Sequence, residues 1–185
     1  MNNYSAIVIE IEPVNRVSFF QAYLDDIIIH SRTPEEHLGH LEQVLAVHLS
    51  AGLRLQPHKS LLLRAEALYL GHIISSEGVR PDPEKIQVIQ DWEESDNITN
   101  LQAFLGLCNY YRVFVDDYSR IALPLLRYLE NSPKKKAPII LDQDARDAFQ
   151  ELKKRLVQCP ILSFPDFEEN SRPFLLDTDW SQDHK

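Results

Sequence analysis

Two adjacent aspartates, Asp25 and Asp26, are the residues of this sequence best suited to chemistry. They lie between two runs rich in apolar residues, FFQAYL and IIIHS, where an ionised side chain is costly to bury unless a cation or a hydrogen-bond donor faces it. Adjacent carboxylates at the tip of a hairpin can hold Mg²⁺, which takes one or two carboxylates together with substrate phosphates. Two such ions would stabilise both oxygens of an in-line phosphoryl displacement. From the dipeptide alone, a solvated β-turn is the simpler alternative.

Short strands are predicted on both sides of this aspartate pair. Residues 5–12 alternate apolar and polar side chains, and residues 17–24 are rich in β-branched and aromatic residues. The stretch DIIIHS predicts a third strand, which pairs back across Asp25 and Asp26 as a tight hairpin. The aspartates are therefore expected at a turn between two paired strands.

A helix is predicted directly after the third strand. Residues 33–36 form a capping box with proline at the first helical position, and leucines recur at helical spacing until Gly52. The predicted apolar stripe consists of Leu38, Leu41, Leu45 and Leu49. His37 and His40 lie one helical turn apart, but a structural zinc site usually needs four ligands, so a solvated helix face is the favoured interpretation.

The rest of the chain changes from short strands to helices. LRLQP and LYLGHIIS predict strands, and SEG at 76–78 predicts a turn. One helix is predicted to start at Asp82 and Pro83, and a second at a capping box formed by Thr99 and Gln102. Ser119 is predicted to cap a third helix, which Pro124 bends or delays. A fourth helix is predicted over 142–157, with Ala145, Ala148, Phe149, Leu152 and Leu156 on one side. PFLLDTDW predicts a final strand.

Composition is typical of a folded globular protein of one domain or two small ones. The 185 residues are 44% hydrophobic and 25% charged, and no apolar run reaches the ~18 residues of a membrane span. The first residues do not resemble a signal peptide, and two cysteines exclude a disulfide framework, so an intracellular, non-membrane protein is expected. The net charge of −9 requires that any nucleic-acid binding come from a local basic surface or from bridging metal ions.

Four ordered motifs resemble the polymerase region of gypsy-type LTR retrotransposon polyproteins. They are YLDDIIIHSRTPEEHLGHLEQVL, LGHIISSEGVRPDPEKIQVIQDW, LQAFLGLCNYYRVFV and ILSFPDF. The resemblance implies an α+β fold with a truncated reverse transcriptase palm (an antiparallel sheet plus a helix), a helical thumb and a short RNase H-like stub. The implied bounds are 1–80 for the partial palm, 81–131 for the thumb, 132–141 for a linker, and 142–185 for a connecting helix and the start of the RNase H-like domain.

The same resemblance implies a site for RNA-directed DNA polymerisation. Asp25 and Asp26 match palm aspartates that bind the catalytic Mg²⁺ or Mn²⁺, and Asp179 matches the first aspartate of the RNase H site. The LGH stretch at 70–72 lies where the family places its primer grip, which seats the primer 3′ end. The residues assigned to an RNA or DNA template–primer are Tyr23, Leu70, Gly71, His72, Tyr110, Tyr111 and Arg112. Of the two adjacent tyrosines, one is expected in the core and the other exposed.

Several parts of the family's machinery are not matched by this sequence. The first palm aspartate comes from an upstream strand, and Glu10 and Glu12 do not match its motif, so they are interpreted as the solvent face of an edge strand. The fingers module and the remaining RNase H carboxylates are not matched either. The isolated chain is therefore expected to bind metal weakly and to lack polymerase and RNase H activity. Its candidate partners are an upstream fingers or palm segment, or a second copy. The alternative is a non-catalytic retroelement remnant that binds protein or nucleic acid.

Overall fold

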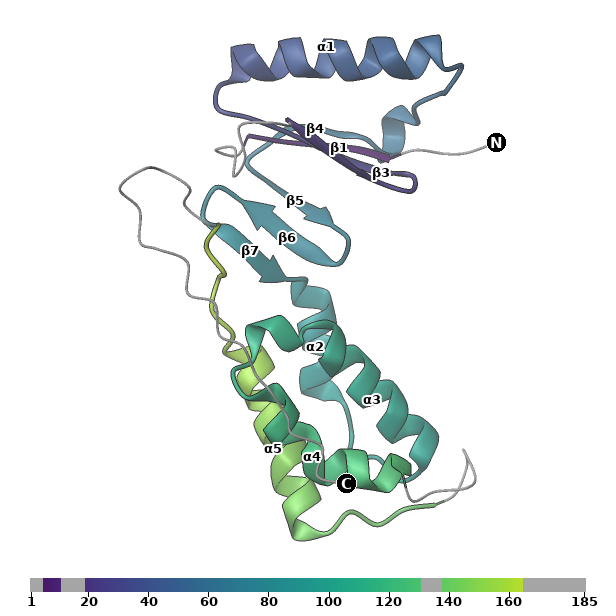
Figure 1. Cartoon of the computed structure of the whole chain (residues 1–185), viewed down its shortest axis with the longest axis vertical. Helices are drawn as coiled ribbons and strands as arrows, with labels where there is room; N and C mark the ends of the chain where they lie inside the picture. The colour runs from purple at the N-terminus through teal and green to yellow at the C-terminus, as the bar shows by residue number, and fades with distance from the viewer. Residues whose placement is uncertain (1–4, 11–18, 131–137, 165–185) are drawn as a thin grey trace, which may run out of the picture.

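Two sheets and a helical bundle follow one another along the molecule in the computed structural model (Figure 1). The structure describes residues 5–10, by their backbone alone, together with residues 19–130 and 138–164. At one end the helix α1 covers a four-stranded sheet, a three-stranded sheet lies on the other side of that sheet, and the bundle forms the opposite end (Figure 1).

The first sheet is mixed, whereas the sequence predicted an antiparallel one. Its strands are β1 (Ser5–Glu10), β2 (Phe20–Tyr23), β3 (Asp26–Ser31) and β4 (Leu61–Arg64), in the order β2-β3-β1-β4. The β2 and β3 strands pair antiparallel, but β1 runs parallel to both β3 and β4. The prediction of an edge strand at Glu10 is therefore wrong. The parallel arrangement is possible because α1 carries the chain across the sheet between β3 and β4.

The helix α1 (Pro34–Ser50) begins where its capping box predicts. The Glu36 amide donates to Thr33 Oγ1 (3.2 Å), and the Glu36 carboxylate accepts from the Arg32 amide (2.8 Å). Val44 packs on Ile27 and Ile29 of β3, so the buried face is rotated away from the predicted leucine stripe. The leucines Leu38 and Leu49 are exposed, and Leu41 and Leu45 are half-buried.

The prediction of a solvated face for His37 and His40 is also wrong. His37 is only 1% exposed, and His40 is half-buried. The hydroxyl of buried Ser31 lies 2.9 Å from His37 Nδ1 and 2.8 Å from His40 Nδ1. The Phe19 ring stacks on the His40 ring with centroids 4.0 Å apart. These histidines are therefore polar groups of the interface between α1 and the sheet.

The second sheet is an antiparallel meander of β5 (Glu66–Tyr69), β6 (His72–Ser75) and β7 (Gly78–Pro81). The predicted strand LYLGHIIS is interrupted by a turn, and the predicted strand LRLQP is replaced by a bridge residue at Leu55 and a short 3₁₀ helix (Pro57–Lys59). Ile28 of the first sheet packs with Ala67 and Tyr69 of β5, so an apolar cluster joins the two sheets.

Four helices make up the bundle. They are α2 (Pro83–Asp91), α3 (Ile98–Tyr110), α4 (Tyr118–Glu130) and α5 (Gln143–Val157). Asp82 caps α2 as predicted, but Asn97 rather than Thr99 caps α3, through its side chain and the Asn100 amide (2.9 Å). Ser119 lies inside α4, as does Pro124, so the proline does not delay that helix.

All four helices share one core. Phe104 of α3 and Phe149 of α5 are buried and stack with ring centroids 4.1 Å apart. The side of α5 that was predicted to be apolar is buried as expected. After α5 the chain returns to the second sheet, where Leu162 and Val79 exchange two backbone hydrogen bonds of 2.8 and 2.9 Å. Of the described helices, none is both long and apolar enough to cross a membrane.

Candidate functional site

The aspartate pair lies at a two-residue hairpin, as predicted. Tyr23 pairs with Asp26, so Leu24 and Asp25 form the turn between β2 and β3. Leu24 has a φ of 52°, which matches the positive φ that such tight hairpin turns require at their first position. Tyr23, Leu24 and Asp25 are exposed, and Asp26 is half-buried. The hairpin therefore presents both carboxylates to solvent at one end of the first sheet.

Asp26 lies on the face of β3 that points toward the second sheet. Side chains alternate along a strand, so Asp26 shares its face with Ile28, which contacts β5. Burial raises the pKa of the Tyr69 hydroxyl, and the negative charge of Asp26 raises it further. Tyr69 directly precedes the turn between β5 and β6. The carboxylate hairpin and this turn are therefore neighbours.

The described residues supply only part of a metal site. Asp25 and Asp26 offer the hard oxygen ligands that Mg²⁺ prefers, which fits an ion whose other ligands are phosphates and water. No group of three or more His, Cys, Asp or Glu side chains suited to a metal is found among the described residues. The register of β1 places Ser5 opposite Asp26 and Glu10 at the far end, opposite Ser31. The near end of the neighbouring strand thus brings no acidic residue beside the pair.

The Leu70–Gly71 turn, which joins β5 to β6, is held by two tyrosines from the end of α3. The Tyr110 hydroxyl donates to the Leu70 carbonyl oxygen (2.6 Å), and the Tyr111 hydroxyl donates to the Gly71 carbonyl oxygen (2.8 Å). His72 Nδ1 also lies 2.8 Å from the Leu70 carbonyl oxygen. Five of the seven residues that the sequence assigns to nucleic-acid binding therefore form one cluster.

The two tyrosines differ in exposure, as predicted. Tyr111 is fully buried, and Tyr110 is 52% exposed. Burial raises the pKa of Tyr111 to about 12, with a smaller contribution from the negative charge of Asp82. The His72 ring packs against both tyrosine rings, with its centroid 5.4 Å from each, and the two tyrosine rings lie 5.0 Å apart. Tyr111 is thus a buried side chain that hydrogen-bonds to the Leu70–Gly71 turn.

The other predicted site residues lie apart from this cluster or outside the described part of the chain. Arg112 is exposed at the start of the short 3₁₀ helix that follows α3. Tyr23 is exposed at the carboxylate hairpin. Asp179 lies outside the described residues, as does the predicted strand around it.

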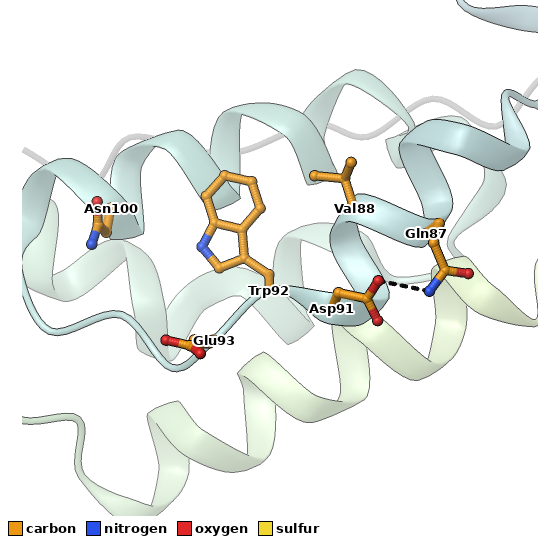
Figure 2. Close-up of a pocket in the computed structure, with 6 residues that line it drawn as sticks. All are labelled: Gln87, Val88, Asp91, Trp92, Glu93 and Asn100. Atoms are coloured by element: carbon orange, nitrogen blue, oxygen red, sulfur yellow. Dashed lines mark hydrogen bonds between the residues drawn. The ribbon is translucent and has the colours of Figure 1, made fainter.

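A surface hollow beside Trp92, between the end of α2 and the start of α3, was not predicted. Figure 2 shows the indole between Asn100 on one side and Val88 on the other. The residues that line the hollow are Gln87, Val88, Asp91, Trp92, Glu93 and Asn100. The Gln87 amide donates to an Asp91 carboxylate oxygen over 2.8 Å (Figure 2). A tryptophan between acidic residues in the stretch QDWEES is the only sequence signal for this feature.

The family model and the sequence relatives that match this chain agree with one another. A family model described as reverse transcriptase (RNA-dependent DNA polymerase) matches residues 5–74. The Pol polyprotein of the Drosophila melanogaster transposon gypsy is 36% identical over 178 residues, which is 92% of this chain and 17% of that polyprotein. The polyprotein of transposon opus from the same fly is 34% identical over 177 residues. The chain therefore spans about a sixth of the length of these relatives.

Solved structures agree with these sequence relatives. A foamy viral protease-reverse transcriptase in complex with double-stranded DNA matches with a TM-score of 0.72 and 30% identity, over 80% of this chain and 26% of that one. The same kind of protein in complex with an RNA/DNA hybrid matches with a TM-score of 0.72 and 29% identity, over 80% and 20% of the two chains.

Proposed function

From the premise that this chain is a reverse transcriptase-like homologue of one segment of the gypsy-type retrotransposon Pol polyproteins, we propose that it seats a primer terminus beside a metal site. The reaction of that site is RNA-directed DNA polymerisation by two-metal nucleotidyl transfer. One observation carries this proposal. The carboxylate hairpin and the Leu70–Gly71 turn are neighbours, because Tyr69 and Leu70 pack in one cluster with Ile28 of the strand that begins at Asp26.

Asp25 and Asp26 are the residues proposed to hold Mg²⁺ or Mn²⁺. Bound there, the ions would supply the positive charge that stabilises the attacking and leaving oxygens of an in-line displacement. The protein's own contribution is to keep both carboxylates at the tip of a hairpin, where Asp25 is exposed and Asp26 is half-buried. A chain of net charge −9 also gains from cations that bridge its carboxylates to phosphates.

The proposed nucleic-acid partner is a template–primer duplex. Support comes from the solved neighbours, which are complexes with DNA and with an RNA/DNA hybrid. We assign residues 1–80 to a partial palm, 81–131 to a thumb, 132–141 to a linker and 142–185 to a connecting helix with the start of an RNase H-like domain. The shared core of α2 to α5 supports grouping the proposed connecting helix with the proposed thumb helices.

We further propose that the isolated chain is inactive as a polymerase. The support is the register of β1, which puts Ser5 rather than a third carboxylate opposite Asp26. Misplacement of a catalytic group by even ~1 Å can cost ~100-fold in rate, so an incomplete ligand set has a severe effect. RNase H activity is proposed to be absent as well.

Primer extension and duplex binding test these proposals separately. With Mg²⁺ or Mn²⁺ we expect no extension, and template-dependent extension that disappears in an Asp25→Ala, Asp26→Ala double variant would contradict the proposed inactivity. Filter binding should show salt-sensitive affinity for a template–primer. Contacts to two phosphates would weaken binding about tenfold between about 50 and 200 mM salt. Absence of any salt-dependent binding would refute the nucleic-acid function.

A second candidate function, a protein-interaction module, is supported by one side of α1. A shallow, largely apolar groove runs along this helix, and one of its residues, Leu41, also packs against the core between α1 and the sheet. It is lined by Leu38, Leu41, Glu42, Leu45, Ala46 and Leu49. An upstream fingers or palm segment, or a second copy, is the proposed occupant. Light scattering that shows a monomer at high concentration, unchanged by Leu49→Lys, would exclude self-association through this face.

A further inference from the structure

The Leu70–Gly71 turn has a backbone that a leucine rarely adopts. Leu70 has a φ of 47° and Gly71 a φ of 69°, so both turn residues are in the left-handed region. For a residue with a side chain this conformation is sterically unfavourable and persists only where the surroundings hold it. The shape of this turn therefore depends on the contacts that it receives.

Those contacts come from the helical bundle. Tyr110 and Tyr111 lie 40 residues further along the chain, yet each hydroxyl donates to one carbonyl of the turn, at 2.6 and 2.8 Å. The Asp82 amide is a second donor to the Gly71 carbonyl oxygen (3.2 Å). The fit is close, because a Cβ on Gly71 would lie 3.3 Å from Tyr110 Cε1 and 3.4 Å from the Tyr111 hydroxyl.

The same turn follows Tyr69, and both Tyr69 and Leu70 pack in the apolar cluster that contains Ile28, in the strand that begins at Asp26. A nucleic-acid end that rests on the turn therefore lies near the carboxylate hairpin. A shift of the turn changes the distance between that end and both carboxylates. Because the tyrosine hydroxyls bond to the turn, they can influence this distance without touching the reacting atoms.

We propose that Tyr110 and Tyr111 are positioning residues, whose hydroxyls hold the Leu70–Gly71 turn in the shape that accepts the recessed 3′ end of a duplex. This inference rests on the proposed function. It replaces base stacking with hydrogen bonding to the turn as the role of both side chains. Removing a hydroxyl should reduce recognition of the primer end and leave binding along the duplex unchanged.

Fluorescence anisotropy with two labelled DNA probes, in Mg²⁺ and low salt, tests this role. One probe is a duplex with a recessed 3′ end, and the other is the same duplex with a blunt end. We expect the wild type to prefer the recessed end, and Tyr110→Phe to weaken that probe alone, by about fivefold, the equivalent of one hydrogen bond. The matched control is Tyr118→Phe, because the Tyr118 hydroxyl bonds to the Leu105 carbonyl oxygen (3.4 Å) within the bundle.

The outcomes separate this inference from the proposed function. If the wild type binds neither probe in a salt-dependent way, the proposed function fails and the inference fails with it. If the wild type prefers the recessed end and the Tyr110→Phe and Tyr111→Phe variants keep the full preference, only the inference is overturned. An equal loss on both probes also overturns it. Circular dichroism checks folding, and half-exposed Tyr110 carries the test should Tyr111→Phe unfold.

Discussion

Substitution of Gly78 tests whether the end of the described chain packs on the second sheet. Gly78 begins β7 and has a φ of 134°. A Cβ at this position would lie 2.2 Å from the Leu162 carbonyl oxygen and 3.1 Å from the Ser163 Cα. The obstructing atoms belong to backbone, so no side-chain rotation can relieve the contact. Gly78→Ala must therefore move one of the two segments.

The loss of stability is the sum of two costs, the backbone strain at a positive φ and the relief of the steric clash. A positive φ of this kind costs about 1–3 kcal/mol for a residue with a side chain. The cheapest way to remove the clash is to release Leu162 from β7, which breaks its two hydrogen bonds with Val79, each worth about 1 kcal/mol net. We therefore expect Gly78→Ala to lower the free energy of unfolding by about 3–5 kcal/mol. Complete release of this segment sets the upper limit of the cost.

Substitutions at two other glycines serve as controls that separate the backbone strain from the steric clash of the added Cβ. Gly52 has a φ of 71°, and a Cβ added there would meet no atom within 4 Å, so Gly52→Ala should cost only about 1 kcal/mol. Gly106 lies inside α3 with equal space and no positive φ, so Gly106→Ala should stabilise by up to about 1 kcal/mol.

Urea unfolding followed by circular dichroism should rank the three variants in the order Gly106→Ala, Gly52→Ala, Gly78→Ala, from most to least stable. Amide hydrogen exchange at Val79 and Leu162 should accelerate in Gly78→Ala alone. If Gly78→Ala unfolds at the same urea concentration as Gly106→Ala, then Leu162 does not pair with β7 and the reasoning is refuted.

Two further predictions concern the bundle core. Phe149→Ala should lower stability by about 3–5 kcal/mol, because a fully buried ring is lost, whereas Ile140→Ala, at an 85% exposed position, should change it by less than about 0.5 kcal/mol. Equal urea midpoints for the two variants would show that α5 is not part of this core. Burial raises the pKa of Cys108 from 9.0 to about 12, so unfolding releases a proton between these pH values. Thermal stability should thus fall as pH rises above 9, less steeply in Cys108→Ala, and equal slopes would contradict the burial.

Local features of the fold and site were predictable because their signals lie close together in the sequence. The carboxylate hairpin follows from two apolar strands around Asp25 and Asp26, and the hydrogen bonds of a hairpin join near neighbours. The starts of α1 and α2 follow from capping residues such as Thr33 and Asp82, which bond to amides two or three residues away. The buried side of α5 follows from a helical repeat of apolar residues.

Only the tertiary structure decided features that depend on distant partners. The direction of β1 could not be inferred, since its neighbours β3 and β4 are separated by a crossover helix. The leucine stripe of α1 gave the wrong face, because Ser31 supplies polar partners that allow His37 to be buried.

The candidate site divides in the same way. By itself, the sequence determined that two adjacent carboxylates sit at a turn and that an LGH stretch and a YYR stretch exist. Their meeting was decided by tertiary packing, since two hydrogen bonds join residues 40 positions apart. The physical reason is that local patterns specify which face of an element is apolar, while the partner of that face depends on the packing of the whole chain.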